Sequence, residues 1–230
     1  SYVDIDYFTA DLMLMKEVSR VADEVSRKYP KIDILLNNVG AYFAFRGVTE
    51  EGFERTFALN HLGYFLMTKK LLPLIEKSGY ARIVNVSSSA HYGIDFEFDN
   101  IHGEKKYKGF DAYKKTKLAN VMFTYELAKR IQNKGITANC LHPGFVATKF
   151  GNNNNILWRM FIGVAKMMMA ISVKDGAKTT LHLACSKDLE NTTGRFFANC
   201  EVKKGSSKAK NDEDNQKLWE ISEKMLAPFL

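Results

Sequence analysis

The chain has 230 residues, 46% hydrophobic and 26% charged, a balance typical of a single globular domain rather than a disordered chain. The formal net charge of +7 comes from scattered lysines rather than a basic stripe with interleaved aromatic residues, which argues against nucleic-acid binding. Three cysteines without paired spacing and five histidines without ligand spacing predict neither disulfides nor a metal site, and they favour a reducing, cytoplasmic compartment.

The first part of the chain predicts strands that alternate with helices. An alternating segment at 2–9 indicates a short strand, and apolar residues at helical spacing over 14–25 indicate a helix. The compact apolar run 32–36 suits a strand buried on both faces of a sheet. A long helix is predicted over about 50–77, and a further buried strand over 82–86.

The alternation continues in the second part. Tyr113 lies near the start of an amphipathic helix, which is followed by a strand over 136–141. A helix near 173–186, a short strand around 195–198 and a final helix in the polar tail complete the pattern. Alternating strands and helices predict a parallel sheet with right-handed crossovers. No composition shift marks a boundary, so we expect one α/β domain over residues 1–230.

Small polar residues and glycines follow three of the predicted strands. They form the segments 37–40, 87–89 and 142–144, which read NNVG, SSS and HPG. Ligands of parallel α/β sheets bind beyond the carboxyl ends of the strands. We therefore expect these three segments to meet at one rim of the sheet and to line a binding site.

Tyr113 and Lys117 are the most informative pair in the chain. They stand four residues apart, so they share one face of the predicted helix. A phenol has an ordinary pKa near 10, and we expect the adjacent ammonium to lower it into a range useful for acid–base catalysis. Any helix can carry this pair by chance, and the remaining motifs decide between the two interpretations.

Five motifs together resemble the short-chain dehydrogenase/reductase family. They are NNVG at 37–40, LNHLG at 59–63, RIVNVSS at 82–88, YKKTK at 113–117 and HPGFVATKF at 142–150. The resemblance extends from Tyr2 to about Arg195, and the stretch 91–120 is most similar to retinol-dehydrogenase-type members, which act on apolar alcohols and aldehydes. It implies a Rossmann-like, doubly wound parallel sheet.

The resemblance implies four catalytic residues. Tyr113 would be the general acid/base, Lys117 would lower its pKa and bind the nicotinamide ribose, and Ser88 would hold the substrate oxygen. Asn60 would belong to a water relay that connects Lys117 to solvent. The spacing of Asn60 in the apolar stripe also predicts a buried amide that needs a partner, so a structural hydrogen bond to backbone is the alternative.

The resemblance also implies a nicotinamide cofactor, NADP or NAD, with NADP slightly favoured. The cofactor-binding positions are Asp11, Leu12, Asn38, Gly40, Tyr113, Lys117, Pro143, Gly144, Val146 and Thr148. Asp11 could instead cap the following helix, or do both. For His91 and His142 we expect a structural or substrate-pocket role.

An apolar, methionine-rich segment at 156–171 lies where the family places its variable substrate lid. Methionine adapts to irregular apolar shapes, which favours a lipophilic substrate. Contact with a membrane surface and ordinary helix packing are the alternatives. The segment is too short and too charged to span a bilayer. Family members often pair through their long helices, which implies a homodimer.

The glycine-rich phosphate loop of the family is absent from the chain, and we expect the first two strands of the fold to be missing. We expect a fragment of a longer NAD(P)-dependent oxidoreductase that interconverts an alcohol and a carbonyl, such as retinol and its aldehyde. Any membrane anchor would lie in the absent part. The alternative is a catalytically inactive, truncated family member that acts as a binding or scaffold protein.

Overall fold

The computed structural model describes residues 3–144 and 172–230, and within them a five-stranded sheet has the order β1-β2-β3-β4-β5. The strands are β1 (Ile34–Asn37), β2 (Ala81–Val86), β3 (Ile136–His142), β4 (Phe196–Ala198) and β5 (Glu201–Lys203). The first four run parallel, which confirms the predicted sheet, and β5 pairs antiparallel with β4. Sequence analysis missed β5 because three exposed residues are too short a run to give a periodic pattern.

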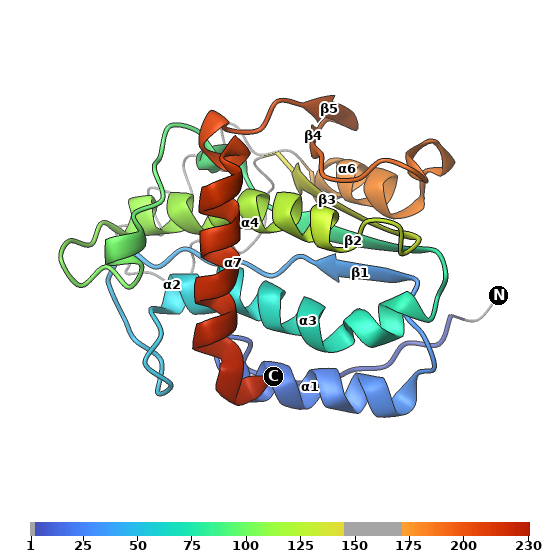
Figure 1. Cartoon of the computed structure of the whole chain (residues 1–230), viewed down its shortest axis with the longest axis horizontal. Helices are drawn as coiled ribbons and strands as arrows, with labels where there is room; N and C mark the ends of the chain where they lie inside the picture. The colour runs from blue at the N-terminus through green and yellow to red at the C-terminus, as the bar shows by residue number, and fades with distance from the viewer. Residues whose placement is uncertain (1–2, 145–171) are drawn as a thin grey trace.

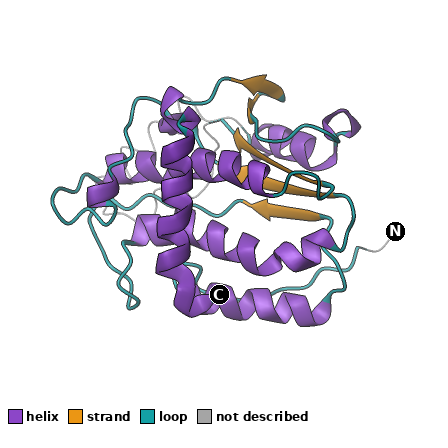
Figure 2. Ribbon diagram, in the orientation of Figure 1, coloured by secondary structure: helices purple, strands orange, loops and turns teal. Residues whose placement is uncertain are grey.

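Helices cover both faces of the sheet (Figures 1 and 2). The α-helices are α1 (Met15–Lys28), α2 (Arg55–Phe57), α3 (Gly63–Glu76), α4 (Gly109–Arg130), α6 (Val173–Cys185) and α7 (Asp212–Leu226). The shorter turns are η1 (Ala58–Leu62), η2 (Ser89–His91), η3 (Phe98–Asn100), η4 (Lys187–Leu189), η5 (Ser207–Lys210) and η6 (Ala227–Phe229). Helices α3 and α4 pack on one face of the sheet, α1 packs beside α3, and α6 packs against β2 and β3 from the other face. Helix α7 crosses α3 and α4 on the outside (Figure 1).

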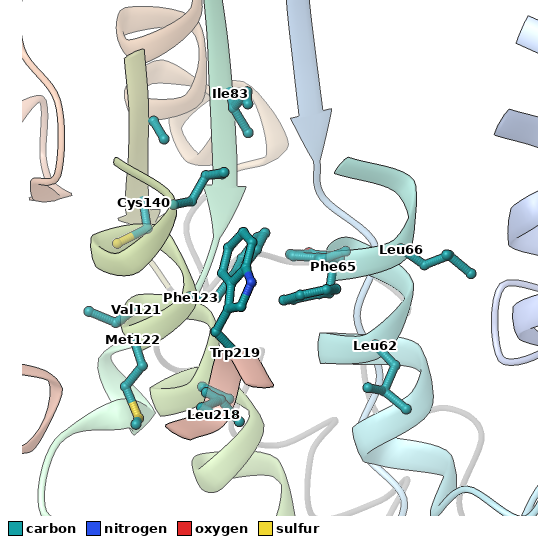
Figure 3. Packing of buried hydrophobic residues seen from close by; sticks show 14 of the residues in the cluster. Leu62, Phe65, Leu66, Ile83, Val121, Met122, Phe123, Cys140, Leu218 and Trp219 are labelled. Atoms are coloured by element: carbon teal, nitrogen blue, oxygen red, sulfur yellow. The ribbon is translucent and has the colours of Figure 1, made fainter. Parts of the chain in front are cut away.

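An aromatic cluster joins α7 to the two central helices (Figure 3). The ring centroids of Phe65 and Trp219 lie 4.7 Å apart, and those of Phe123 and Trp219 lie 5.8 Å apart. Ile83 and Cys140 face this cluster from the sheet, whereas Val84 and Leu141 face the smaller core under α6. Strand residues alternate between faces, so β2 and β3 are buried on both sides, as predicted for β2.

The helix predicted over 50–77 begins later and is interrupted. Glu54 caps α2 by accepting hydrogen bonds from the backbone amides of Thr56 and Phe57. A single π-helical turn, η1, then separates α2 from α3. Because the wider turn changes the angle between successive side chains, Asn60 and His61 both point into the interior, each 0% exposed.

Two predictions at the N-terminal side of the sheet are wrong. The described part of segment 2–9 forms no strand, and Val3, Ile5 and Tyr7 are all more than half exposed. Strand β1 is not buried on both faces, because Ile34 is 44% and Leu36 is 42% exposed. Among the described residues, α6 packs against β2 and β3 on this face, and it does not extend over Ile34 and Leu36 far enough to bury them.

The other predicted elements are confirmed as α1, α4, β3, α6, β4 and α7. Among the described residues no helix has the length and apolar character needed to cross a bilayer. The predicted lid at 156–171 lies outside the described residues, so its role stays a prediction.

Candidate active site

Tyr113 and Ser88 lie together at the carboxyl-end rim of the sheet. Tyr113 is in the second turn of α4, and Ser88 follows β2 directly. The phenol is 8% exposed, and Tyr42 packs edge-on against its ring at 6.4 Å. Burial raises the pKa of Tyr113 to about 12, and the hydrogen bond with the Ser88 side chain acts in the opposite direction. The structure therefore brings these two predicted catalytic residues together.

The structure also distinguishes Ser88 from the serines on either side of it. Ser87 is buried, and its hydroxyl donates to the carbonyl oxygen of Lys117 at 2.7 Å. Ser89 is exposed. The Ser88 hydroxyl accepts from the amide of Ala90 at 3.1 Å and pairs with Tyr113. Ser88 alone among the three thus presents its hydroxyl to the phenol.

Lys117 is buried beside Tyr113, one turn further along α4. Its ammonium donates to the carbonyl oxygen of Val86 at 3.1 Å and lies 5.7 Å from the centre of the Tyr113 ring. Burial lowers the pKa of Lys117 to about 8. The expectation that Lys117 lowers the pKa of Tyr113 is not met, because burial of the phenol outweighs any effect of a charge at this distance.

Asn60 makes three hydrogen bonds with its side-chain amide. Its oxygen accepts from the amide of Ala41 at 2.9 Å, and its nitrogen donates to the Ala41 carbonyl at 2.9 Å and to the Thr116 hydroxyl at 3.0 Å. Asn60 thus makes the predicted hydrogen bond to backbone, and its part in a water relay stays a prediction. Sequence analysis singled out neither Ala41 nor Thr116, although Thr116 lies within the motif at 113–117.

Four of the predicted cofactor residues follow the two parallel strands on either side of β2. Asn38 and Gly40 follow β1, and Pro143 and Gly144 follow β3 on the other side of Ser88. A Cβ atom at Gly40 would lie 3.1 Å from the Lys117 nitrogen. The absence of a side chain at Gly40 therefore leaves the space that the Lys117 ammonium occupies beside this segment. Val146 and Thr148 lie outside the described residues.

Asp11 and Leu12 precede α1, and Asp11 does not cap it. The Asp11 carboxylate accepts from the amide of Met13 at 2.9 Å in a local turn. The first amides of α1 donate instead to Glu51, at 2.6 Å from Met15 and 2.9 Å from Lys16. The Asp11 carboxylate is exposed, and the predicted contact with adenine stays a prediction.

Two histidines lie close to Ser88. His91 is buried and bonds to the Ser88 carbonyl, and His142 ends β3 with a buried Nδ1 that has no partner in the described part of the chain. Burial lowers the pKa of both imidazoles, so both are neutral near pH 7. No group of three or more metal-ligating side chains occurs within 3–144 and 172–230.

The model of the short chain dehydrogenase family matches residues 2–156, and the chain belongs to this family. Its curated relatives identify the branch. It is 37% identical to mouse retinol dehydrogenase 14 over 94% of this chain and 65% of that protein. It is 39% identical to mouse retinol dehydrogenase 12 over 94% of this chain and 68% of that protein. The chain is thus retinol-dehydrogenase-like in sequence, as predicted, and spans about two thirds of the length of these relatives.

Solved structures show the same fold. A protein of uncharacterised function from Mycobacterium paratuberculosis is 27% identical and has a TM-score of 0.74, over 94% of this chain and 74% of its own. An NADPH-bound carbonyl reductase from chicken fatty liver is 20% identical with a TM-score of 0.57, over 81% of this chain and 71% of its own. The second likeness supports the fold alone.

Proposed function

We propose that the chain is an NAD(P)-dependent oxidoreductase that interconverts an alcohol and a carbonyl on a lipophilic substrate of the retinol type. The observation that carries this proposal is the buried phenol of Tyr113, hydrogen-bonded to Ser88 and adjacent to the buried ammonium of Lys117. Proton transfer at an alcohol or carbonyl oxygen needs such a group in reach of an oxygen-binding hydroxyl.

The protonation state of Tyr113 favours reduction. With a pKa raised to about 12, the phenol is protonated at neutral pH and can donate its proton to a carbonyl oxygen that accepts a hydride. Ser88 would hold that oxygen within reach of the phenol. The imidazole of His91 does not compete as the proton donor, since both of its nitrogens are already hydrogen-bonded.

The residues at the rim fit a nicotinamide cofactor. Lys117 is a buried ammonium that donates one hydrogen bond to the backbone carbonyl of Val86, so it retains donors for the hydroxyl groups of a ribose. Gly40 lies against this nitrogen, and a side chain at position 40 would contact it. Asn38 would lie against the adenosine half, and Pro143 and Gly144 against the nicotinamide. The cofactor would supply the hydride.

Aromatic side chains next to the phenol support an apolar substrate. Phe110 is 55% exposed and stacks on Tyr113 with 6.3 Å between ring centroids. Tyr42 contacts both rings. An exposed ring that touches the reacting phenol would bind a hydrocarbon chain better than a charged substrate. The retinol dehydrogenases among the relatives point to the same substrate class.

The predicted partners complete the proposal. We propose a homodimer, a cytoplasmic location and contact between segment 156–171 and a membrane surface. A static light-scattering mass and co-sedimentation with phosphatidylcholine vesicles would check the dimer and the contact.

The proposal is tested with the protein expressed from the complete reading frame that encodes this chain, with NADPH or NADH and three carbonyl substrates. We expect reduction of all-trans-retinal and of a long-chain aldehyde, and much slower reduction of a small polar carbonyl compound. The competing function, a non-catalytic scaffold, predicts no turnover and no rise in melting temperature with millimolar NADPH. The absence of both turnover and a thermal shift would overturn the proposal in favour of the scaffold.

A further inference from the structure

His91 lies between Ser88 and a distant segment of the chain. It is 0% exposed in η2, and its Nδ1 lies 2.6 Å from the carbonyl oxygen of Ser88. On the other side of the ring, Nε2 lies 3.1 Å from the backbone nitrogen of Ser206. The ring packs on Phe196, with 4.6 Å between centroids. The imidazole therefore connects the turn after β2 to the segment after β5.

The two partners fix the tautomer of this imidazole. A backbone carbonyl can only accept a hydrogen bond, so Nδ1 must carry the proton that is donated to Ser88. A backbone amide can only donate, so Nε2 must present its lone pair to Ser206. A doubly protonated ring would lose the second bond. The site is thus complementary to one form of His91, neutral and protonated at Nδ1.

The segment 204–206 is anchored on the same turn by a second bond. Tyr92 donates from its hydroxyl to the carbonyl oxygen of Lys204 at 2.6 Å. Ser206 is 5% exposed. The two hydrogen bonds to this segment differ in one respect. The His91 ring also bonds to the Ser88 carbonyl, whereas among the described residues the Tyr92 hydroxyl bonds only to Lys204. Tyr92 therefore offers a matched control that loosens the segment without touching the Ser88 carbonyl.

We propose that His91 is a positioning residue, which holds the Ser88 turn through Nδ1 while segment 204–206 holds the ring through Nε2. The turn that it holds carries the Ser88 hydroxyl, which also accepts from the amide of Ala90. The inference rests on the proposed function, in which Ser88 binds the substrate oxygen. It assigns to segment 204–206 a part in the geometry of the site, which this segment exerts through the His91 ring.

The tautomer is tested by nitrogen NMR on the full chain labelled with ¹⁵N-histidine, with His91 assigned from the spectrum of His91→Asn. We expect a protonated Nδ1 and an unprotonated Nε2 near pH 7. Ser206→Pro removes the backbone N–H that donates to Nε2 of His91. The φ of −50° at Ser206 is compatible with proline. It should shift the Nε2 resonance, whereas Ser206→Ala, which keeps the amide, should not. A proton on Nε2, or equal spectra for the two variants, would overturn the proposal.

The positioning of Ser88 is tested by amide hydrogen exchange without cofactor or substrate. The amides of Ala90 and His91 donate to the hydroxyl and the carbonyl of Ser88. We expect His91→Leu to speed their exchange by about tenfold, the equivalent of one lost hydrogen bond. His91→Asn, whose amide can replace Nδ1 as donor, should restore most of the protection, and Tyr92→Phe should leave it unchanged.

Equal exchange at Ala90 in His91→Leu and Tyr92→Phe would contradict the proposal. If His91→Leu does not fold, Ser206→Pro and Ser206→Ala give the same comparison. Because these measurements need no turnover, a failure of His91 to hold Ser88 is seen separately from a failure of the chain to act as an oxidoreductase. Should the chain reduce retinal, His91→Asn should keep kcat closer to the unmodified value than His91→Leu, with KM for NADPH unchanged.

Discussion

Lys117 is a lysine whose buried surroundings destabilise its charged form. The side chain is 3% exposed, and its nitrogen lies over the rings of Tyr113 and Tyr64, at 5.7 and 5.9 Å from their centroids. These contacts and the bond to the Val86 carbonyl replace water only in part, so burial lowers its pKa from 10.5 to about 8. Such a strained group is expected at a functional site rather than in a purely structural core.

The lowered pKa of Lys117 predicts how stability depends on pH. Below pH 8 the ammonium is charged in both the folded and the unfolded chain, and the folded state carries the full cost of burial. Between pH 8 and 10.5 that cost is relieved, because the folded state loses the proton first. We expect Lys117→Met to raise the free energy of unfolding at pH 7 by about 2–3 kcal/mol, with a gain that shrinks towards pH 10.5.

Urea denaturation at pH 7 and at pH 10 measures this effect. Lys114→Met on the same helix is the control, because its side chain is only half-buried, and it should show no such change with pH. A loss of stability in Lys117→Met at pH 7 would mean that the ammonium stabilises the fold, contrary to the expected sign.

At the residue scale, the sequence was enough to predict which residues form the site, but not the direction in which the pKa of Tyr113 is shifted. The motifs were enough to predict that Tyr113, Lys117 and Ser88 share one rim, because helix spacing and strand ends are local properties. The direction of the Tyr113 pKa depends on burial by Tyr42 and Phe110, and Tyr42 comes from a segment that the sequence pattern does not pair with α4. That contact was not predictable from spacing.

At the scale of single elements, α1 depends on a capping group from far along the chain. Glu51 binds the first two amides of α1, across 36 residues of sequence from Met15. We expect Glu51→Ala to lower the free energy of unfolding by about 1 kcal/mol, a typical value for a lost helix cap. Glu50→Ala, which removes only an exposed ion pair with Lys16, should leave the urea midpoint unchanged. Equal effects of the two substitutions would mean that Glu51 does not act as a cap.

The π-turn η1 makes a second prediction at this scale. Asn60 in η1 satisfies the backbone amide and carbonyl of Ala41, so Asn60→Ala would leave buried polar groups unpaired. We expect a loss of about 2–4 kcal/mol in the free energy of unfolding. Asn38→Ala, at an exposed position, should change it by less than about 0.5 kcal/mol. Thermal or urea unfolding of the two variants measures these changes. An Asn60→Ala variant as stable as the unmodified protein would contradict the structural role of the Asn60 amide.

Sequence analysis placed the helices well and their ends less well. The period of apolar residues predicted α1, α3 and α4, because it records which face of each helix is buried. It could not show that Glu54 starts the second helix at Arg55, or that η1 interrupts it, since both depend on tertiary hydrogen bonds. The cap of α1 was missed for the same reason.

At the scale of the whole molecule, the sheet is covered unevenly. Leu36 and Val84 are register partners on neighbouring strands and share one face, yet Leu36 is 42% exposed and Val84 is 1% exposed. The sequence could not predict this difference, because both lie in similar apolar runs and only the position of α6 separates them.

This uneven cover predicts opposite outcomes for the same substitution. Leu36→Lys should change the free energy of unfolding by less than about 0.5 kcal/mol, whereas Val84→Lys should cost more than about 4 kcal/mol because it buries an unpaired charge. Circular dichroism with urea measures both. A large loss in Leu36→Lys would indicate that something covers this face in the folded protein.

The role of Tyr113 as the proton donor is tested most directly by one substitution, Tyr113→Phe, measured as retinal reduction with NADPH. We predict a fall in kcat of about 10²- to 10⁴-fold, the usual contribution of a general acid, with the NADPH dissociation constant little changed. Tyr125→Phe, on the same helix and outside the candidate site, should keep kcat. Retained turnover in Tyr113→Phe would contradict the account.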